Sequence, residues 1–174
     1  MNNKIWLYIV LIILILVALM SVFLSKSKNK GKEISFNDIT QDVFIESGEK
    51  GYYFINSDEE WQNLLQNRNL SMNTSKMFIS YQNTANDDFL PSIDFNNSSI
   101  IAVFMGTRNT GGYEINIKNI IETKNNITVT VNEIVPDKNC NVLQVITYPY
   151  QIIKTQKITK NVDFKTINKI QKCD

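Results

Sequence analysis

The sequence contains no histidine and only two cysteines in 174 residues. Without histidine, the chain has no Ser-His-Asp or Cys-His catalytic group, no histidine-liganded zinc and no imidazole pH switch. Two cysteines are too few for a zinc site made of cysteines alone. Cys140 and Cys173 therefore leave two alternatives, which are one disulfide in an oxidising compartment or two unpaired thiols.

Positive charge is scarce where a nucleic-acid-binding protein needs it. Of the 18 Lys and Arg residues, five lie in the first 32 residues, whereas all 17 acidic residues lie at or after Glu33. The chain from Glu33 onward therefore holds 13 basic and 17 acidic residues, a formal charge of −4. Its only arginines are Arg68 and Arg108. We expect no binding to nucleic acid.

What the sequence does have is one long apolar run near its start. The twenty residues from Ile5 to Leu24 carry no charge, and as a helix they would be about 30 Å long, the thickness of the bilayer's hydrocarbon core. We therefore predict that residues 1–24 are a single transmembrane anchor. The alternative, a cleaved signal peptide, has a shorter apolar core followed by a small-x-small pair. No such pair follows here, because Phe23, a large residue, occupies the second small position after Ser21.

Residues 25–33, which read SKSKNKGKE, are a lysine-rich stalk typical of a solvated linker. Four lysines follow the apolar run and only Lys4 precedes it, so the lysine bias alone places the following domain in the cytoplasm. Long domains, however, cross the membrane largely regardless of this bias. The two arguments conflict over the side of the membrane.

Residues 34–174 are predicted to form one domain of short elements separated by Asn, Gly and Asp. A helix is indicated at Ser57–Asn67, where Ser57 and Glu60 form a capping box and Trp61, Leu64 and Leu65 share one face. We predict a mainly β (α+β) fold, a β-sandwich or barrel-like domain with one packed helix. The predicted strands are Gly51–Asn56, Met77–Tyr81, Ser99–Met105, Tyr113–Ile121, Ile127–Val131, Val142–Thr147, Tyr150–Thr155 and Val162–Ile167, with a turn at Asn125-Asn126.

The loop from Gly106 to Tyr113 holds three of the six glycines, at the junction of a buried and an exposed strand. Such density indicates positive φ or close backbone approach at several positions. A phosphate-binding loop is excluded, because Gly112 stands where that motif has lysine and a strand follows in place of a helix. The loop is either a strained turn without a ligand or a contact surface.

A series of short motifs follows the predicted domain in a fixed order. They are Ser57-Asp-Glu-Glu-Trp61, Leu90-Pro-Ser-Ile-Asp-Phe95, Ile101-Ala-Val-Phe-Met-Gly106, Arg108-Asn-Thr-Gly-Gly-Tyr113, Val135-Pro136, Thr147-Tyr-Pro-Tyr150 and Ile152-Ile153. In this order they resemble the PrcB family, over about Phe36 to Phe164. The resemblance implies a bacterial, extracytoplasmic, non-catalytic domain that stabilises or assembles a surface protease. It therefore favours the outside of the cell membrane for a single-pass protein.

We expect a protein-binding edge made by the TGGY and TYPY loops, similar to the paired loops of Ig-like cysteine protease inhibitors. Glycines allow close backbone approach, while tyrosine and arginine are enriched at binding hot spots. The partner is expected to be a protein such as a surface protease, which this domain stabilises, assembles or inhibits. The alternative is a structural envelope component with no protease partner. The candidate binding residues are Arg108, Asn109, Thr110, Gly111, Gly112, Tyr113, Tyr148, Pro149 and Tyr150. We expect no enzymatic activity, metal or cofactor.

Overall fold

The computed structural model describes residues 3–27, 31–40, 44–45, 48–67, 70–71 and 93–173. The chain divides into two compact units, Met1–Lys32 and Glu33–Asp174. The predicted strand at Met77–Tyr81 and the motif beginning at Leu90 lie largely or wholly outside the described residues.

The first unit contains helix α1 (Asn3–Ser27), which continues past the predicted end of the anchor at Leu24. Large apolar side chains between Trp6 and Met20 are exposed along it. Among the described residues, no helix has both the length and the apolarity needed to cross a membrane. The predicted transmembrane span therefore has no support from the structure.

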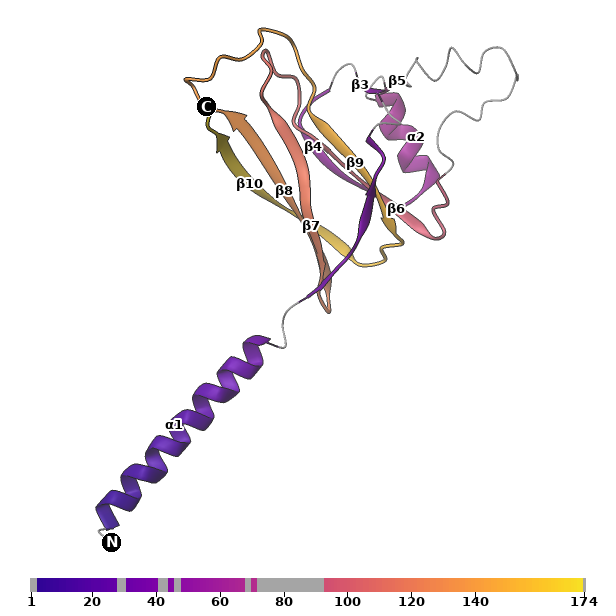
Figure 1. Ribbon diagram of the computed structural model, residues 1–174. Helices are drawn as coiled ribbons and strands as arrows, with labels where there is room; N and C mark the ends of the chain where they lie inside the picture. Colours follow the sequence, from indigo (N-terminus) through magenta and orange to yellow (C-terminus); the bar gives the residue numbers. More distant parts are fainter. Residues whose placement is uncertain are drawn as a thin grey trace. The chain divides into compact units, whose positions relative to one another are not determined.

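The second unit contains two four-stranded sheets, which Figure 1 shows as separate layers. The first sheet has the order β1-β7-β8-β10, and its strands are β1 (Lys32–Glu33), β7 (Glu114–Glu122), β8 (Asn126–Pro136) and β10 (Asn161–Gln171). The second has the order β2-β9-β6-β4, and its strands are β2 (Phe36–Asp38), β9 (Tyr150–Gln156), β6 (Ser98–Phe104) and β4 (Gly51–Ile55). Strands β3 (Phe44–Ile45) and β5 (Leu70–Ser71) form a separate pair. This mainly β architecture confirms the predicted fold class.

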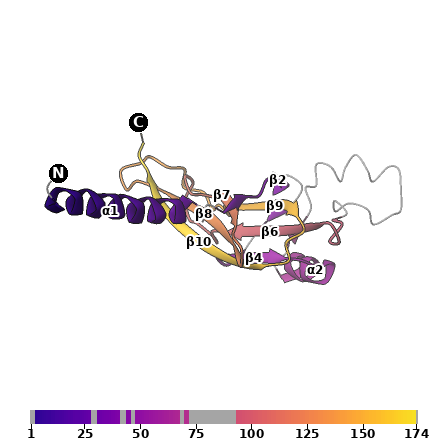
Figure 2. The same cartoon turned by 90° about the horizontal axis from the view of Figure 1, so that it is seen from below.

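The sandwich core lies between the two sheets. Alternate residues of β8, Ile127, Val129 and Val131, are buried against Ile101 and Ile153 of the second sheet. Strand β6 is buried on both faces, because its other residues face a second core under α2 (Asp58–Asn67). Figure 2 shows α2 beside β4 on this outer side. The continuous apolar sequence of β6 follows from its position between two cores.

Helix α2 forms as its sequence predicts. The Glu60 amide donates to Ser57 Oγ at 3.2 Å, and the Glu60 carboxylate accepts from the Asn56 amide at 2.7 Å. These bonds satisfy amide groups that a helix start leaves without partners. Trp61, Leu64 and Leu65 are buried on one face, as expected.

Four predictions about the strands and turns need correction. The predicted strand Ile127–Val131 is longer in the structure, where β8 ends at Pro136. Residues Val142–Thr147 are not a strand, because their partner segment is irregular, as described below. The predicted strand Val162–Ile167 is longer and runs parallel to β8, where it forms an edge of the first sheet. The turn before β8 has Lys124 and Asn125 at its tip, and is closed by a bond from the Thr123 amide to the Asn126 carbonyl at 2.9 Å.

Cys140 and Cys173 form a disulfide with a Cα–Cα distance of 5.4 Å. It joins the segment after β8 to the end of β10, where the Asp137 amide also donates to the Gln171 carbonyl at 2.9 Å. Of the two alternatives left by the sequence, the structure contains the bridged form.

Replacing both cysteines, Cys140→Ser with Cys173→Ser, is expected to lower the free energy of unfolding by about 3–4 kcal/mol. The reason is that the bridge closes a loop of 33 residues in the unfolded chain. Urea unfolding with and without reductant measures this. Reductant should destabilise the wild type and leave the double variant unchanged. A wild type that is insensitive to reductant contradicts the prediction.

Candidate functional site

The two predicted binding segments lie side by side, because they continue two paired strands. Strands β6 and β9 are antiparallel neighbours, with Phe104 opposite Tyr150 at their end. Beyond it the Met105 amide donates to the Pro149 carbonyl, and Arg108 and Thr147 exchange two backbone hydrogen bonds, all at 2.9 Å. We call residues 105–113 and 141–149 together the loop ribbon. It is an irregular extension of the second sheet.

The loop ribbon begins with a bulge at Gly106. Three residues separate Phe104 from Arg108, whereas two separate Thr147 from Tyr150, so the glycine side carries one extra residue. Gly106 has φ +80°, and a Cβ there would lie 2.9 Å from the Lys50 amide nitrogen. Glycine is therefore required both by the backbone conformation and by the close approach of a neighbouring segment.

A second bulge on the opposite side exposes apolar side chains. The Gly111 amide donates to the Leu143 carbonyl at 2.8 Å. Between these two paired positions, the segment from Leu143 to Thr147 has three intervening residues and the segment from Arg108 to Gly111 has two. The extra residue therefore lies on the Leu143 side. Leu143, Val145 and Ile146 are 77%, 50% and 58% exposed. Backbone hydrogen bonds hold this segment at Leu143 and Thr147, and the three apolar side chains are exposed to solvent.

The three candidate tyrosines are half-buried and face different cores. Tyr113 packs against the sandwich core, whereas Tyr148 and Tyr150 pack against the core under α2. The ring of Tyr150 stacks on Phe104 at 6.3 Å, and burial raises the pKa of Tyr150. The tyrosines thus do not form the single shared edge that the sequence led us to expect. They fix the loop ribbon to both cores.

Arg108 is held within the ribbon. Its Nη2 donates to the Met105 carbonyl at 2.9 Å, and its guanidinium carbon lies 5.3 Å from the centre of the Tyr113 ring. Its Nε is buried without a hydrogen-bond partner among the described residues. The expected binding residue therefore makes intramolecular contacts that hold the loop.

The remaining candidates complete the ribbon's backbone. Thr147 Oγ1 donates to the Thr110 carbonyl at 3.0 Å. Gly112 has φ +83° and packs on Pro136, where a Cβ would meet the proline ring at 3.2 Å. Asn109 and Gly112 are exposed. The hydrogen bond joins the two segments of the ribbon, and Gly112 brings the ribbon against the end of β8.

A buried carboxylate lies at the same end of the sandwich. Glu133 is 5% exposed, and Lys50 Nζ contacts its two oxygens at 2.6 and 2.7 Å. The Tyr52 hydroxyl also donates to Glu133. Burial raises the pKa of Glu133, but these hydrogen bonds and the charges of Lys50 and Arg108 outweigh it, so the pKa lies below its ordinary value. Burial and Glu133 together raise the pKa of Tyr52 to about 12.

Sequence reasoning missed both the exposed apolar residues and Glu133. Leu143, Val145 and Ile146 fall in the predicted strand Val142–Thr147, although their irregular spacing argues against a regular strand. Glu133 interrupts the alternating apolar row of β8, which was a visible signal. Its partner Lys50 is 83 residues away in the sequence, and nothing in the sequence indicates that the two side chains meet.

Gly106→Ala is expected to lower the free energy of unfolding by at least about 1–2 kcal/mol, because alanine disfavours positive φ and the methyl group would contact Lys50. Gly111→Ala is the matched control. Its φ is not in the left-handed region and its nearest contact would be 3.7 Å, so a change within about 0.5 kcal/mol is expected. Urea unfolding measures both. Equal effects of the two variants would exclude a special role for Gly106.

Comparison with known proteins bears on this region alone. Residues 99–156, which are 58 of the 174, match the family model described as PrcB C-terminal. No curated protein and no solved structure matches the chain. The match is shorter than the expected stretch from Phe36 to Phe164, and it includes β6, the loop ribbon and β9. It supports the resemblance to the PrcB family, a family associated with a protease complex.

Proposed function

We propose that this chain is a membrane-anchored, extracytoplasmic and non-catalytic protein-binding domain that contacts its partner through the loop ribbon. The observation that carries the proposal is the exposure of Leu143, Val145 and Ile146 in a segment held by backbone hydrogen bonds at Leu143 and Thr147. Neighbouring exposed apolar side chains mark interaction surfaces in soluble domains. A backbone that is ordered before binding loses little entropy when a partner docks.

The proposed partner is a surface protease, which the domain stabilises, assembles or inhibits. Support comes from the family match, whose residues 99–156 contain both strands of the loop ribbon. The ribbon presents backbone and apolar contacts, which suit a complementary protein surface. The described residues contain no group of three His, Cys, Asp or Glu side chains placed to hold a metal ion. The proposal needs none.

The proposed attachment is the apolar run from Ile5 to Leu24. It rests on the sequence, because twenty uncharged residues match the thickness of a bilayer. The full length depends on Ile5 and residues 22–24, which lie outside the part of α1 whose side chains are described. Within that part, the large apolar side chains point outward, as they do in a helix surrounded by lipid.

The disulfide supports an extracytoplasmic domain. Disulfides persist in oxidising compartments and are rare in the cytoplasm. The Cys140–Cys173 bridge therefore argues against the cytoplasmic placement suggested by the lysines after the apolar run. The lysine rule has little effect on long translocated domains, so we give the disulfide more weight.

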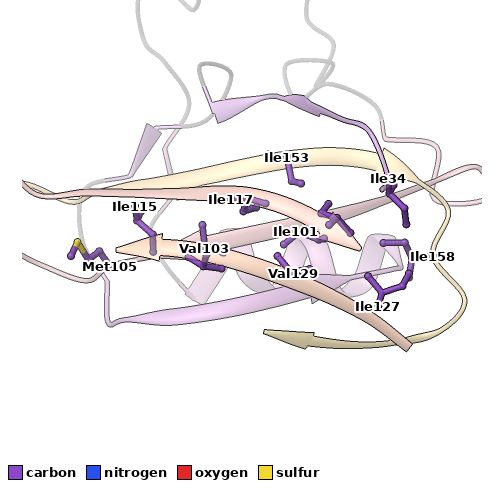
Figure 3. Packing of buried hydrophobic residues seen from close by; sticks show 12 residues of the cluster. Ile34, Ile101, Val103, Met105, Ile115, Ile117, Ile127, Val129, Ile153 and Ile158 are labelled. Carbon is purple, nitrogen blue, oxygen red and sulfur yellow. The ribbon is translucent and has the colours of Figure 1, made fainter. Parts of the chain in front are cut away.

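The position of the ribbon within the domain suits a tethered binding module. The chain joins the sandwich at β1, and directly after it the Ile34 amide donates to the Ile120 carbonyl at 2.9 Å. Figure 3 shows Ile34 and Ile158 at one end of the core and Met105 and Ile115 at the other. The ribbon continues from Met105, directly after β6, whose seven residues span about 24 Å of β-sheet. A partner can occupy the ribbon without displacing the point where the chain joins the domain.

Replacing Leu143, Val145 and Ile146 together by serine is expected to abolish partner binding while the domain stays folded, because these side chains are exposed. The measurement is affinity purification of the full chain from detergent-solubilised membranes, with quantitative mass spectrometry of the bound proteins. The matched control is Ile170→Ser, which removes an apolar side chain that is 67% exposed on β10. Recovery should fall about tenfold or more for the triple variant alone.

A single protease recovered with the wild type and with Ile170→Ser, and lost with the triple variant, supports the whole proposal. A different protein lost in the same way supports the ribbon and rejects the protease. Equal recovery with all three chains rejects the ribbon as the binding surface.

Protease treatment of intact cells is expected to degrade residues 33–174 and leave a short membrane-bound fragment containing α1. The reason is that the proposed domain faces outward from a single anchor. Immunoblotting with tags at each end detects the fragments, and a cytoplasmic protein controls for lysis. Full protection in intact cells, with digestion after lysis, places the domain inside. Release of the whole chain by salt or carbonate washing excludes the anchor.

A further inference from the structure

Glu133 occupies a position where the fold calls for an apolar side chain. The inward-facing row of β8 consists of Ile127, Val129, Val131, Glu133 and Val135. All of these except Glu133 are apolar and belong to the sandwich core or pack against it. Replacing a buried ion pair by apolar residues of similar volume is often neutral or stabilising. Its position therefore invites an explanation other than stability.

The contacts of Glu133 connect the two sheets beneath the loop ribbon. Lys50 and Tyr52, which contact the carboxylate from the other layer, come from β4 and the residue before it. The Tyr52 hydroxyl also lies 3.1 Å from Thr166 Oγ1 of β10. The carboxylate thus fixes the start of β4 against the far end of β8.

The residue before β4 also contacts the ribbon, at the bulge of Gly106. Gly106 lies so close to the Lys50 backbone that a Cβ could not fit without movement. The Arg108 charge is near enough to stabilise the ionised Glu133 carboxylate. A shift of Lys50 would therefore move both the bulge at Gly106 and the charge environment of Arg108.

We infer that Glu133 is a positioning residue for the loop ribbon, acting through Lys50 on the bulge at Gly106. Its role is to keep the ribbon in one arrangement, and any benefit to partner binding rests on the proposed function. The inference predicts that removing the carboxylate loosens the ribbon more than it loosens the sandwich.

The test is amide hydrogen exchange of the full chain in detergent micelles, without any partner. The variant is Glu133→Leu, because leucine fits the apolar row of β8. The two groups that lose the carboxylate keep other partners: Lys50 is half exposed and can be solvated, and the Tyr52 hydroxyl keeps its hydrogen bond to Thr166. Exchange at the ribbon amides of Arg108, Gly111 and Thr147 should accelerate about tenfold or more, while the β8–β10 ladder stays near wild type.

The matched control is Glu122→Leu, at the ion pair with Lys160 at the opposite end of the same sheet. It should leave ribbon exchange unchanged. Wild-type exchange at the three ribbon amides in a folded Glu133→Leu protein overturns the inference. Uniform acceleration across ribbon and ladder also overturns it, because that is the result of a merely structural role.

If Glu133→Leu does not fold, Glu133→Gln is measured in the same way and decides by the same criteria. Glutamine keeps the shape of the side chain and removes its charge. Because no partner is present, the result is independent of partner capture. Selective loosening together with failed capture would leave this inference standing and reject the proposed function.

Discussion

The arrangement of this domain's candidate site depends on backbone pairing that continues past the end of a regular sheet. Strands β6 and β9 stop at Phe104 and Tyr150, yet their hydrogen bonds resume at Arg108 and Thr147 after one extra residue. The extra residue fits because Gly106 adopts a positive φ directly against Lys50. Two bulges, one on each segment, then make the ribbon an irregular extension of the sheet. The exposure of its apolar side chains follows from that geometry.

Around this ribbon, interactions that cost stability are combined with interactions that restrict motion. Glu133 lies in an apolar row and is compensated by Lys50 and Tyr52, which is a poor arrangement for stability alone. The Cys140–Cys173 disulfide joins the start of the ribbon's second segment to the end of β10. Half-buried tyrosines attach the ribbon to both cores. A flexible loop would need none of these restraints, whereas a preorganised binding surface benefits from each.

Local patterns predicted the elements whose surroundings are regular. The capping box and apolar face indicated α2, the continuous apolar run indicated β6, and alternation indicated β8. The same pattern reasoning was wrong for Val142–Thr147, because an apolar segment reads as a strand even when its partner is bulged. The parallel pairing of β10 and the Glu133–Lys50 contact join residues far apart in the sequence. A single sequence carries no direct sign of such contacts, nor of which cysteine alternative is realised.

In the glycine-rich region, the tyrosines and Arg108 make contacts that hold the loop, and their part in partner binding stays a prediction. Leu143, Val145 and Ile146 are exposed and make up the surface that we propose for a partner. The most direct measurement places a photo-activatable amino acid at position 143 in living cells, with exposed Lys118 of β7 as the comparison position. The account predicts a covalent adduct with one protein from position 143 and none from position 118. No adduct from position 143, or the same adducts from both, would contradict it.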